Sequence, residues 1–214
     1  MTAAIRARRP RFRAASLLVL VAPLLVAGTV RALAAEPSGA GGTEAWGEGA
    51  SALGESDFRL LDEIRGGVLA HSPGNTESGT VDLAVELLSD HLPVATGNGL
   101  LDFVLSPRLH AGAVVSTAGE TSYVYAGLTW DFAITDSLFI ETAFGGALNN
   151  GVDGERGRIE MGCVATFRSA AGVGYRFDDS WSIIAGVEHL SHAGLCGDDN
   201  EGLTNVGVRV GYRF

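Results

Sequence analysis

The C-terminal segments "WSIIAGVEHLS" (residues 181–191) and "LTNVGVRVGYRF" (residues 203–214) both alternate between apolar and small or polar side chains. Residues two apart in a β-strand share a face. In the first segment the odd-numbered positions are apolar up to Val187. In the second the even-numbered positions are apolar from Val206 onward, whereas Arg209 lies on the other face. The two segments therefore predict an antiparallel hairpin with one apolar outer face.

Eight segments in all read as strands, each bounded by turn residues. They span approximately residues 61–71, 80–89, 101–117, 121–134, 137–148, 159–177, 180–192 and 203–214. Long, polar, Gly-rich connections follow the first, fifth and seventh segments, and tight turns follow the fourth and sixth. Long loops at one end and short turns at the other are typical of an outer-membrane barrel. The sequence thus predicts an all-β fold, an eight-stranded antiparallel transmembrane β-barrel. A soluble eight-stranded barrel or sandwich is the alternative.

The N-terminal region has the order of a secretory signal peptide. Five arginines precede the apolar run "SLLVLVAPLLVAGTV", and small residues follow up to Ala35. A transmembrane anchor is the competing interpretation, but Pro23 interrupts a run that is shorter than the roughly 20 residues a spanning helix needs. We expect a signal peptide over residues 1–35, a flexible Gly- and Glu-rich segment over 36–60, and the barrel over 61–214.

Charge excludes one class of partner. All 15 basic residues are arginines, and nine of them lie beyond the expected signal peptide, against 25 acidic residues. The exported chain would then carry a net charge of about −16, which is unsuited to nucleic acid.

The alternation places His189 and Ser191 on the apolar outer face, and Thr204 joins them across the hairpin at the loop-bearing end. Polar groups on a lipid-facing wall are costly unless they are interfacial or functional. One interpretation is that His189 and Ser191 are interfacial polar residues at the level of the lipid headgroups, with no catalytic role. The other is an activated hydroxyl, with the imidazole of His189 as the general base for Ser191 Oγ.

Around these residues the sequence resembles the lipid A 3-O-deacylase family, outer-membrane acyl-ester hydrolases of Gram-negative bacteria. The resemblance covers roughly residues 62–214. It includes "IRGGVLAHS", "TSYVYAGLTW", "LFIETAFGGAL" and "FRSAAGVGYRF", and is most specific in "EHLSHAGL" followed by "NEGLTNVGVRVGYRF". In this family an eight-stranded barrel carries a His-x-Ser-Asn motif and a downstream Glu, which form a serine hydrolase triad on the outside of the barrel.

The resemblance implies that Ser191 attacks an ester of lipid A in lipopolysaccharide, with His189 as the base and no cofactor. It also implies a site at the level of the outer leaflet of the cell outer membrane. A non-catalytic barrel with a structural or surface-binding role is the rival interpretation. Which acyl chain is removed, and whether the protein forms a homodimer, are left open.

Two positions depart from the family pattern. His192 stands where the family has the Asn thought to help form the oxyanion hole, and its ring or the backbone N–H groups near Gly194 are candidates for that role. Thr204 stands at the position of the family Glu and has no negative charge to stabilise an imidazolium. Glu201, in the adjoining loop with Asp198 and Asp199, is the alternative acid.

Cys163 and Cys196 are expected near the same end of neighbouring strands. An exported chain is exposed to oxidising conditions, so a disulfide between them is predicted, with two unpaired thiols as the alternative. A metal site made by His189, His192 and Cys196 is not expected, because the two histidines point to opposite faces of the strand.

Overall fold

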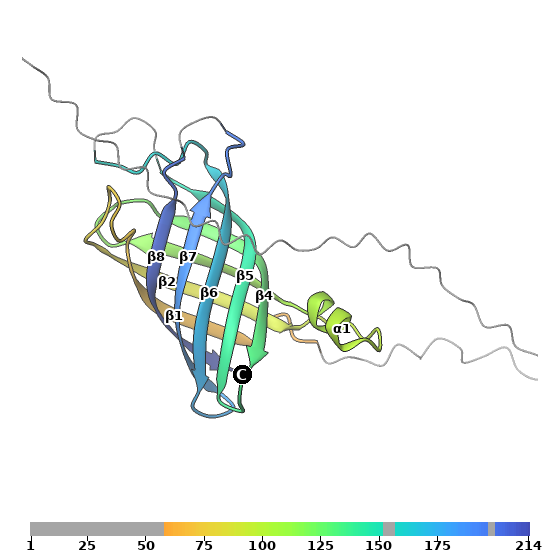
Figure 1. Ribbon diagram of the computed structural model, residues 1–214. Coiled ribbons are helices and arrows are strands. Elements are labelled where there is room, and N and C mark those ends of the chain that lie inside the picture. The colour runs from red at the N-terminus through yellow and green to blue at the C-terminus, as the bar shows by residue number, and fades with distance from the viewer. Residues whose placement is uncertain (1–57, 152–156, 197–199) are drawn as a thin grey trace, which may run out of the picture. The chain divides into compact units, whose positions relative to one another are not determined.

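The computed structural model describes residues 58–151, 157–196 and 200–214, which form a closed barrel of eight antiparallel strands (Figure 1). The strands are β1 (Glu63–Ala70), β2 (Val81–His91), β3 (Arg108–Ser116), β4 (Tyr123–Ala133), β5 (Leu138–Asn149), β6 (Ala165–Arg176), β7 (Trp181–Ser191) and β8 (Leu203–Arg213). Each strand pairs with the next along the chain, and β1 closes the barrel by pairing with β8. The predicted eight-stranded antiparallel barrel is confirmed.

The expected signal peptide over 1–35 and nearly all of the segment 36–60 lie outside the described residues. Within the part that the structure describes, no helix has both the length and the apolar character needed to cross a membrane.

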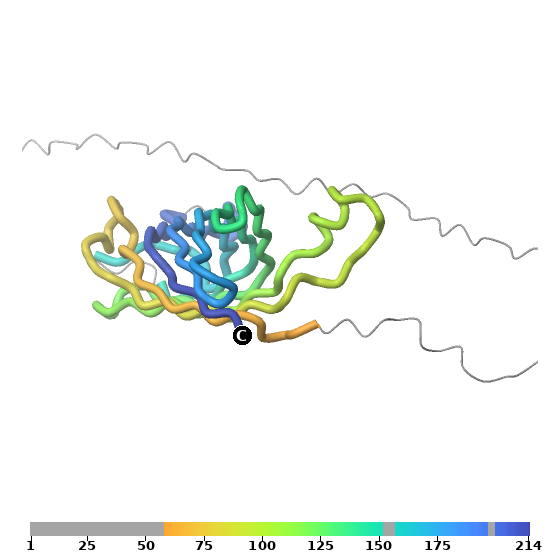
Figure 2. Tube along the Cα trace, turned by 90° about the horizontal axis from the view of Figure 1, so that it is seen from below, coloured from red at the N-terminus to blue at the C-terminus, as the bar shows by residue number. Residues whose placement is uncertain are grey.

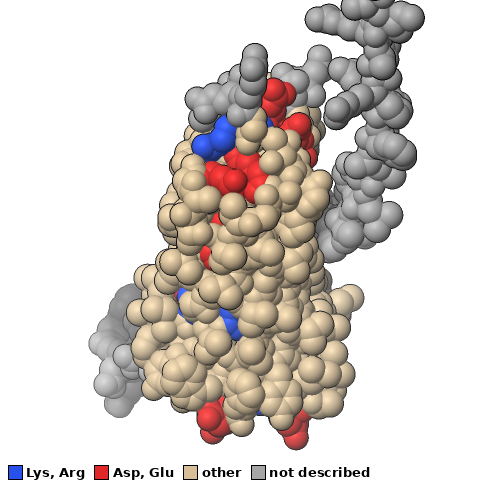
Figure 3. Space-filling view, turned by 90° about the vertical axis from the view of Figure 1, so that its left-hand side faces the viewer, with Lys and Arg blue, Asp and Glu red and all other residues tan. Residues whose placement is uncertain are grey.

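The alternation predicted for the last two strands is present. In β7 the even-numbered Ser182, Ile184, Glu188 and Leu190 are buried, while the odd-numbered side chains are exposed or half-buried. In β8 the side chains from Val206 to Tyr212 at even positions are exposed in the same way. The outer wall is therefore apolar. Figure 3 shows it as a face with few charged side chains between acidic groups at the two ends.

The lumen is filled by paired charges and aromatic rings. The carboxylate of Glu188, from β7, accepts hydrogen bonds from Arg168 (2.6 Å) and Arg209 (2.6 Å) and from the hydroxyl of Tyr123. The guanidinium of Arg168 also lies over the ring of Tyr125, 3.9 Å from its centroid. The buried carboxylate of Glu188 is thus paired with two buried guanidinium groups, which offsets the cost of taking these charges out of water.

The predicted strand 101–117 is wrong in its first part. Residues Gly99–Leu105 form a short helix, α1, and β3 begins only at Arg108. The Asn98 side chain accepts hydrogen bonds from the backbone N–H groups of Leu100 and Leu101, which is how an N-cap residue starts a helix. The apolar run was read as extended because seven residues are too few to display a helical period.

The predicted strand 159–177 also begins too early, since β6 starts at Ala165. Ile159 and Met161 are fully buried, but they belong to the loop that packs over the end of the lumen. Two apolar residues separated by one position have the spacing of a strand. Here they are loop residues whose side chains pack into the hydrophobic core. The other predicted strand boundaries agree with the structure to within two residues.

The two ends of the barrel differ as predicted for five of the seven connections, whereas the β2–β3 connection, which contains α1, is long at the end with the tight turns, and the β3–β4 connection is short at the other end. The turn between β4 and β5 and the turn between β6 and β7 are tight, and they lie at the end that carries the C-terminus (Figure 1). The longer loops after β1, β5 and β7 lie at the opposite end. Figure 2, viewed from the C-terminal end, shows α1 standing to one side of the barrel.

Candidate functional site

His189 and Thr204 lie opposite each other in the β7–β8 pair, on the outer wall near the loop end. His189 Nδ1 is 2.8 Å from Thr204 Oγ1. When Nδ1 carries the proton, it donates to the threonine hydroxyl. Nε2 then keeps the lone pair that a general base requires.

Ser191 follows His189 by two residues and lies on the same outward face at the end of β7. In the part of the chain that the structure describes, no hydrogen bond joins Ser191 Oγ to the imidazole. Such bonds are often formed only when substrate binds. The residue paired with Ser191 across the strands is Phe167, whose exposed ring stacks on Phe144 at a centroid distance of 6.0 Å. The serine is thus bordered by an aromatic surface suited to an apolar substrate.

Gly202 lies directly against the imidazole of His189. Its φ angle of +70° is in the left-handed region that favours glycine, and a Cβ placed there would lie 2.8 Å from His189 Cε1 and 3.3 Å from Nε2. The carbonyl of Gly202 accepts a hydrogen bond of 3.0 Å from Asn75 in the first loop. The backbone at Gly202 therefore determines where the ring can lie. Sequence reasoning missed this residue because its role depends on φ and not on a reactive side chain.

The variant Gly202→Ala is expected to lower any Ser191-dependent esterase rate by about 10- to 100-fold, because a displaced base loses its alignment with the nucleophile. Gly74→Ala is the matched control, since Gly74 also has a positive φ of +83° but a Cβ added there would meet nothing within 4 Å. Equal rates for the two variants, measured with a soluble ester substrate in detergent, would contradict the positioning role.

No carboxylate among the described residues forms an ion pair with His189. The Glu201 side chain instead accepts a hydrogen bond of 3.4 Å from the backbone N–H of Glu160, in the loop after β5. Asp198 and Asp199 lie outside the described residues. Thr204 is therefore the polar partner that the structure gives to His189 Nδ1.

The candidates for the oxyanion hole lie in the turn that follows β7. His192 is buried, and its Nδ1 accepts a hydrogen bond of 3.2 Å from the backbone of Cys196. Ala193 and Gly194 both have positive φ angles, 53° and 79°, so the chain turns sharply beside Ser191. His192 points into the fold, and the backbone N–H groups of this turn become the better candidates.

Cys163 and Cys196 form a disulfide with a Cα–Cα distance of 5.9 Å. The bond joins the loop after β5 to the loop after β7, which begins directly after Ser191. Because Cys196 is bonded to sulfur, it offers no thiolate to a metal ion.

A buried charged cluster in the loops was not recognised in the sequence. His71 lies between two carboxylates, with Nδ1 2.7 Å from Asp82 and Nε2 2.9 Å from Glu77. Glu77 also accepts hydrogen bonds from the Thr121 backbone (3.0 Å) and from Arg158 (2.7 Å). One carboxylate thus ties together the three loops that follow β1, β3 and β5. Its partners are far apart in the sequence, so no local motif indicates it.

Burial lowers the pKa of the His71 imidazole, but hydrogen bonds to Asp82 and Glu77 outweigh this effect and raise the pKa above its ordinary value. A raised folded-state pKa means that the stabilisation is fully present below the pKa of the unfolded chain, about 6.5, and is lost as the pH rises through the folded value. We expect an NMR titration of the folded protein in detergent to give His71 a midpoint above about 6.5. A lower midpoint would contradict the doubly paired imidazolium.

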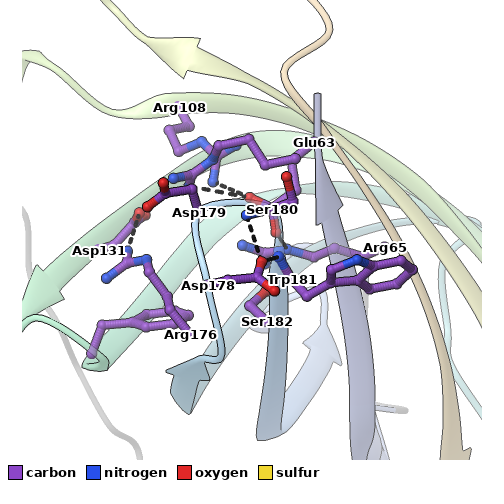
Figure 4. A pocket seen from close by; sticks show the side chains of 12 residues that line it. Glu63, Arg65, Arg108, Asp131, Arg176, Asp178, Asp179, Ser180, Trp181 and Ser182 are labelled. Carbon is purple, nitrogen blue, oxygen red and sulfur yellow. Dashed lines mark hydrogen bonds and ion pairs between the residues drawn. The ribbon is translucent and has the colours of Figure 1, made fainter.

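A pocket opens at the other end of the barrel, away from all these residues. Its charged side chains point into a common space from several strands and pair with one another, as Arg108 does with Glu63 and Arg176 with Asp131 (Figure 4). None of the candidate site residues lines it. The pairing leaves this pocket without an excess of either charge.

Comparisons with known proteins match a part of the chain that includes His189, Ser191 and Thr204. The family model described as "Lipid A 3-O-deacylase (PagL)" matches residues 98–213. Among solved structures, the crystal structure of the outer membrane enzyme PagL has 20% sequence identity and a TM-score of 0.55, covering 71% of this chain and 99% of that chain. The N-terminal β-barrel domain of Pseudomonas aeruginosa OprF has 13% identity and a TM-score of 0.48, covering 73% of this chain and 99% of that chain. No curated protein sequence matches the chain.

Proposed function

Because the chain belongs to the lipid A 3-O-deacylase (PagL) family, we propose that it is an outer-membrane enzyme that removes an ester-linked acyl chain from lipid A. The observation that carries the proposal is the outward-facing pair of His189 and Ser191, with His189 Nδ1 hydrogen-bonded to Thr204. A site on the outer wall meets its lipid substrate without extracting it from the bilayer.

In the proposed reaction, Ser191 Oγ attacks the ester carbonyl while His189 Nε2 accepts the hydroxyl proton. The tetrahedral intermediate collapses with cleavage of the ester C–O bond, the His189 imidazolium gives its proton to the leaving sugar oxygen, and the acyl group stays on Ser191. Water, deprotonated by the same imidazole, then releases the fatty acid and restores the serine. Thr204 keeps the proton on Nδ1, so that Nε2 faces the reaction.

The orientation expected for the barrel in the membrane supports a site in the outer leaflet. His189 and Ser191 lie at the end with the long loops, and Phe214 lies at the end with the tight turns, which in outer-membrane barrels faces the periplasm. We propose that residues 1–35 direct the export this requires.

One observation favours a second candidate function. Thr204 provides no negative charge, and without the acidic member a triad loses orders of magnitude in rate. A barrel that binds lipid A without cleaving it would keep the same wall and loops.

The test is to incubate the purified barrel in detergent with lipid A and to determine the masses of the lipid products by mass spectrometry. We expect the loss of one acyl chain with the native protein, and a rate reduced by at least about 1000-fold with Ser191→Ala. The matched control is Ser137→Ala, a serine in the turn between β4 and β5 at the opposite end of the barrel, which should keep the native rate. Intact lipid A after incubation with a folded native barrel would favour the binding function.

A further inference from the structure

Helix α1 packs on the outside of the barrel. The ring of Phe103 lies 4.4 Å from that of Phe132, and Trp130 Nε1 donates a hydrogen bond of 3.1 Å to the Val104 carbonyl. Trp130 and Phe132 occupy outward positions at the C-terminal end of β4, on the same wall that carries the exposed apolar side chains. Figures 1 and 2 show the helix beside the barrel and not beneath its end.

The face of α1 that points away from β4 is apolar, and its side chains are exposed in the described part of the chain. Leu100 is 73% exposed, and Leu101, Val104 and Leu105 are each nearly half exposed. These positions, spaced i, i+1, i+4 and i+5, form one side of a helix. Asp102 is the helix's one charged side chain, and its carboxylate is already occupied by the backbone and hydroxyl of Thr96. A helix that is apolar on both its docked and free faces is suited to hydrocarbon and not to water.

The level of the helix along the barrel matches a membrane boundary. At the same end of the barrel, exposed aromatic rings pack in pairs on the outer wall, including Tyr175 with Phe177 and Trp181 with Tyr212. Rings at the ends of transmembrane strands mark the interface between headgroups and acyl chains. One face of α1 thus packs on the apolar outer wall of the barrel. Its other face is also apolar and extends the lipid-facing surface away from the barrel.

We propose that α1 lies in the periplasmic leaflet of the membrane, with Leu100, Leu101, Val104 and Leu105 inserted at the boundary between phospholipid headgroups and acyl chains. The helix enlarges the apolar surface on one side of the barrel, and so helps to set the depth and tilt at which the opposite, loop-bearing end meets lipid. This inference rests on the proposed membrane location of the barrel. It does not depend on the hydrolase chemistry.

The test uses single thiols labelled with an environment-sensitive fluorophore, since Cys163 and Cys196 are bonded to each other. The label is placed at Leu101→Cys, with two reference positions: Leu83→Cys on the exposed wall of β2 and Asp179→Cys in the β6–β7 turn. The full barrel is reconstituted in vesicles of phosphatidylethanolamine and phosphatidylglycerol. Quenching is measured with aqueous iodide and with nitroxide lipids.

We expect the Leu101 label to be quenched by iodide at least about threefold less than the Asp179 label, and by shallow nitroxide lipids as strongly as the Leu83 label. A Leu101 label that behaves like the Asp179 label, while the Leu83 label is lipid-quenched, would overturn the proposal but leave the barrel in the membrane. A label shielded from both quenchers would also overturn it and indicate a protein partner such as a second copy. Iodide quenching at Leu83 would show that the proposed membrane location itself fails.

Discussion

Replacing Thr204 by glutamate is expected to raise the rate of lipid A deacylation by about 10- to 1000-fold. Thr204 lies opposite His189 and already reaches Nδ1 at 2.8 Å, so a side chain from this position has access to the imidazole. A hydroxyl can orient the ring but cannot stabilise the imidazolium that forms when Ser191 loses its proton. A carboxylate does both, which lowers the barrier to the attack.

Thr204→Gln is the matched control, because glutamine has the shape of glutamate without its charge. The rates are to be compared by mass spectrometry of lipid A over a series of times, at equal amounts of folded barrel. If Thr204→Glu and Thr204→Gln have the same rate, the missing negative charge is not what limits His189.

Glu188→Ala is expected to lower the free energy of unfolding by roughly 3–5 kcal/mol, because it removes the carboxylate to which two buried guanidinium groups donate their hydrogen bonds. Arg168 and Arg209 both bind the same carboxylate oxygen at 2.6 Å, and the hydroxyl of Tyr123 binds the other oxygen. All four side chains are buried in the lumen, where water cannot replace the lost contacts.

Urea unfolding in lipid vesicles, followed by circular dichroism, measures this loss. Val187→Ala is the control, since Val187 is the neighbouring residue on β7 but points outward into the apolar surroundings. A Glu188→Ala barrel within about 1 kcal/mol of the Val187→Ala barrel would contradict the buried-pair interpretation.

Much of the barrel was predictable because one physical constraint acts on every strand. A wall that is apolar outside and polar inside imposes a period of two, and this is why the outward positions of β7 and β8 agree with the sequence pattern. The approach of His189 to Thr204 follows from the same rule applied to a hairpin. Neither needs knowledge of a distant part of the chain.

The features that were missed depend on other constraints. Helix α1 is determined by the cap at Asn98 and by packing against Phe132, which a short apolar run does not indicate. The role of Gly202 depends on a backbone angle, and the role of Glu77 depends on three loops that meet only in the folded barrel. Long-range contacts of this kind leave no period in the sequence.

The central claim is that Ser191 is a nucleophile on the outer wall, and covalent labelling tests it most directly. The native barrel is treated with a lipid-soluble alkyl phosphonate ester, which reacts with activated serines, and the adduct is located by peptide mass spectrometry. We expect a single adduct on Ser191, much slower labelling of His189→Ala, and none on Ser191→Ala. Loss of an acyl chain from lipid A by a barrel whose Ser191 stays unlabelled would contradict the serine mechanism.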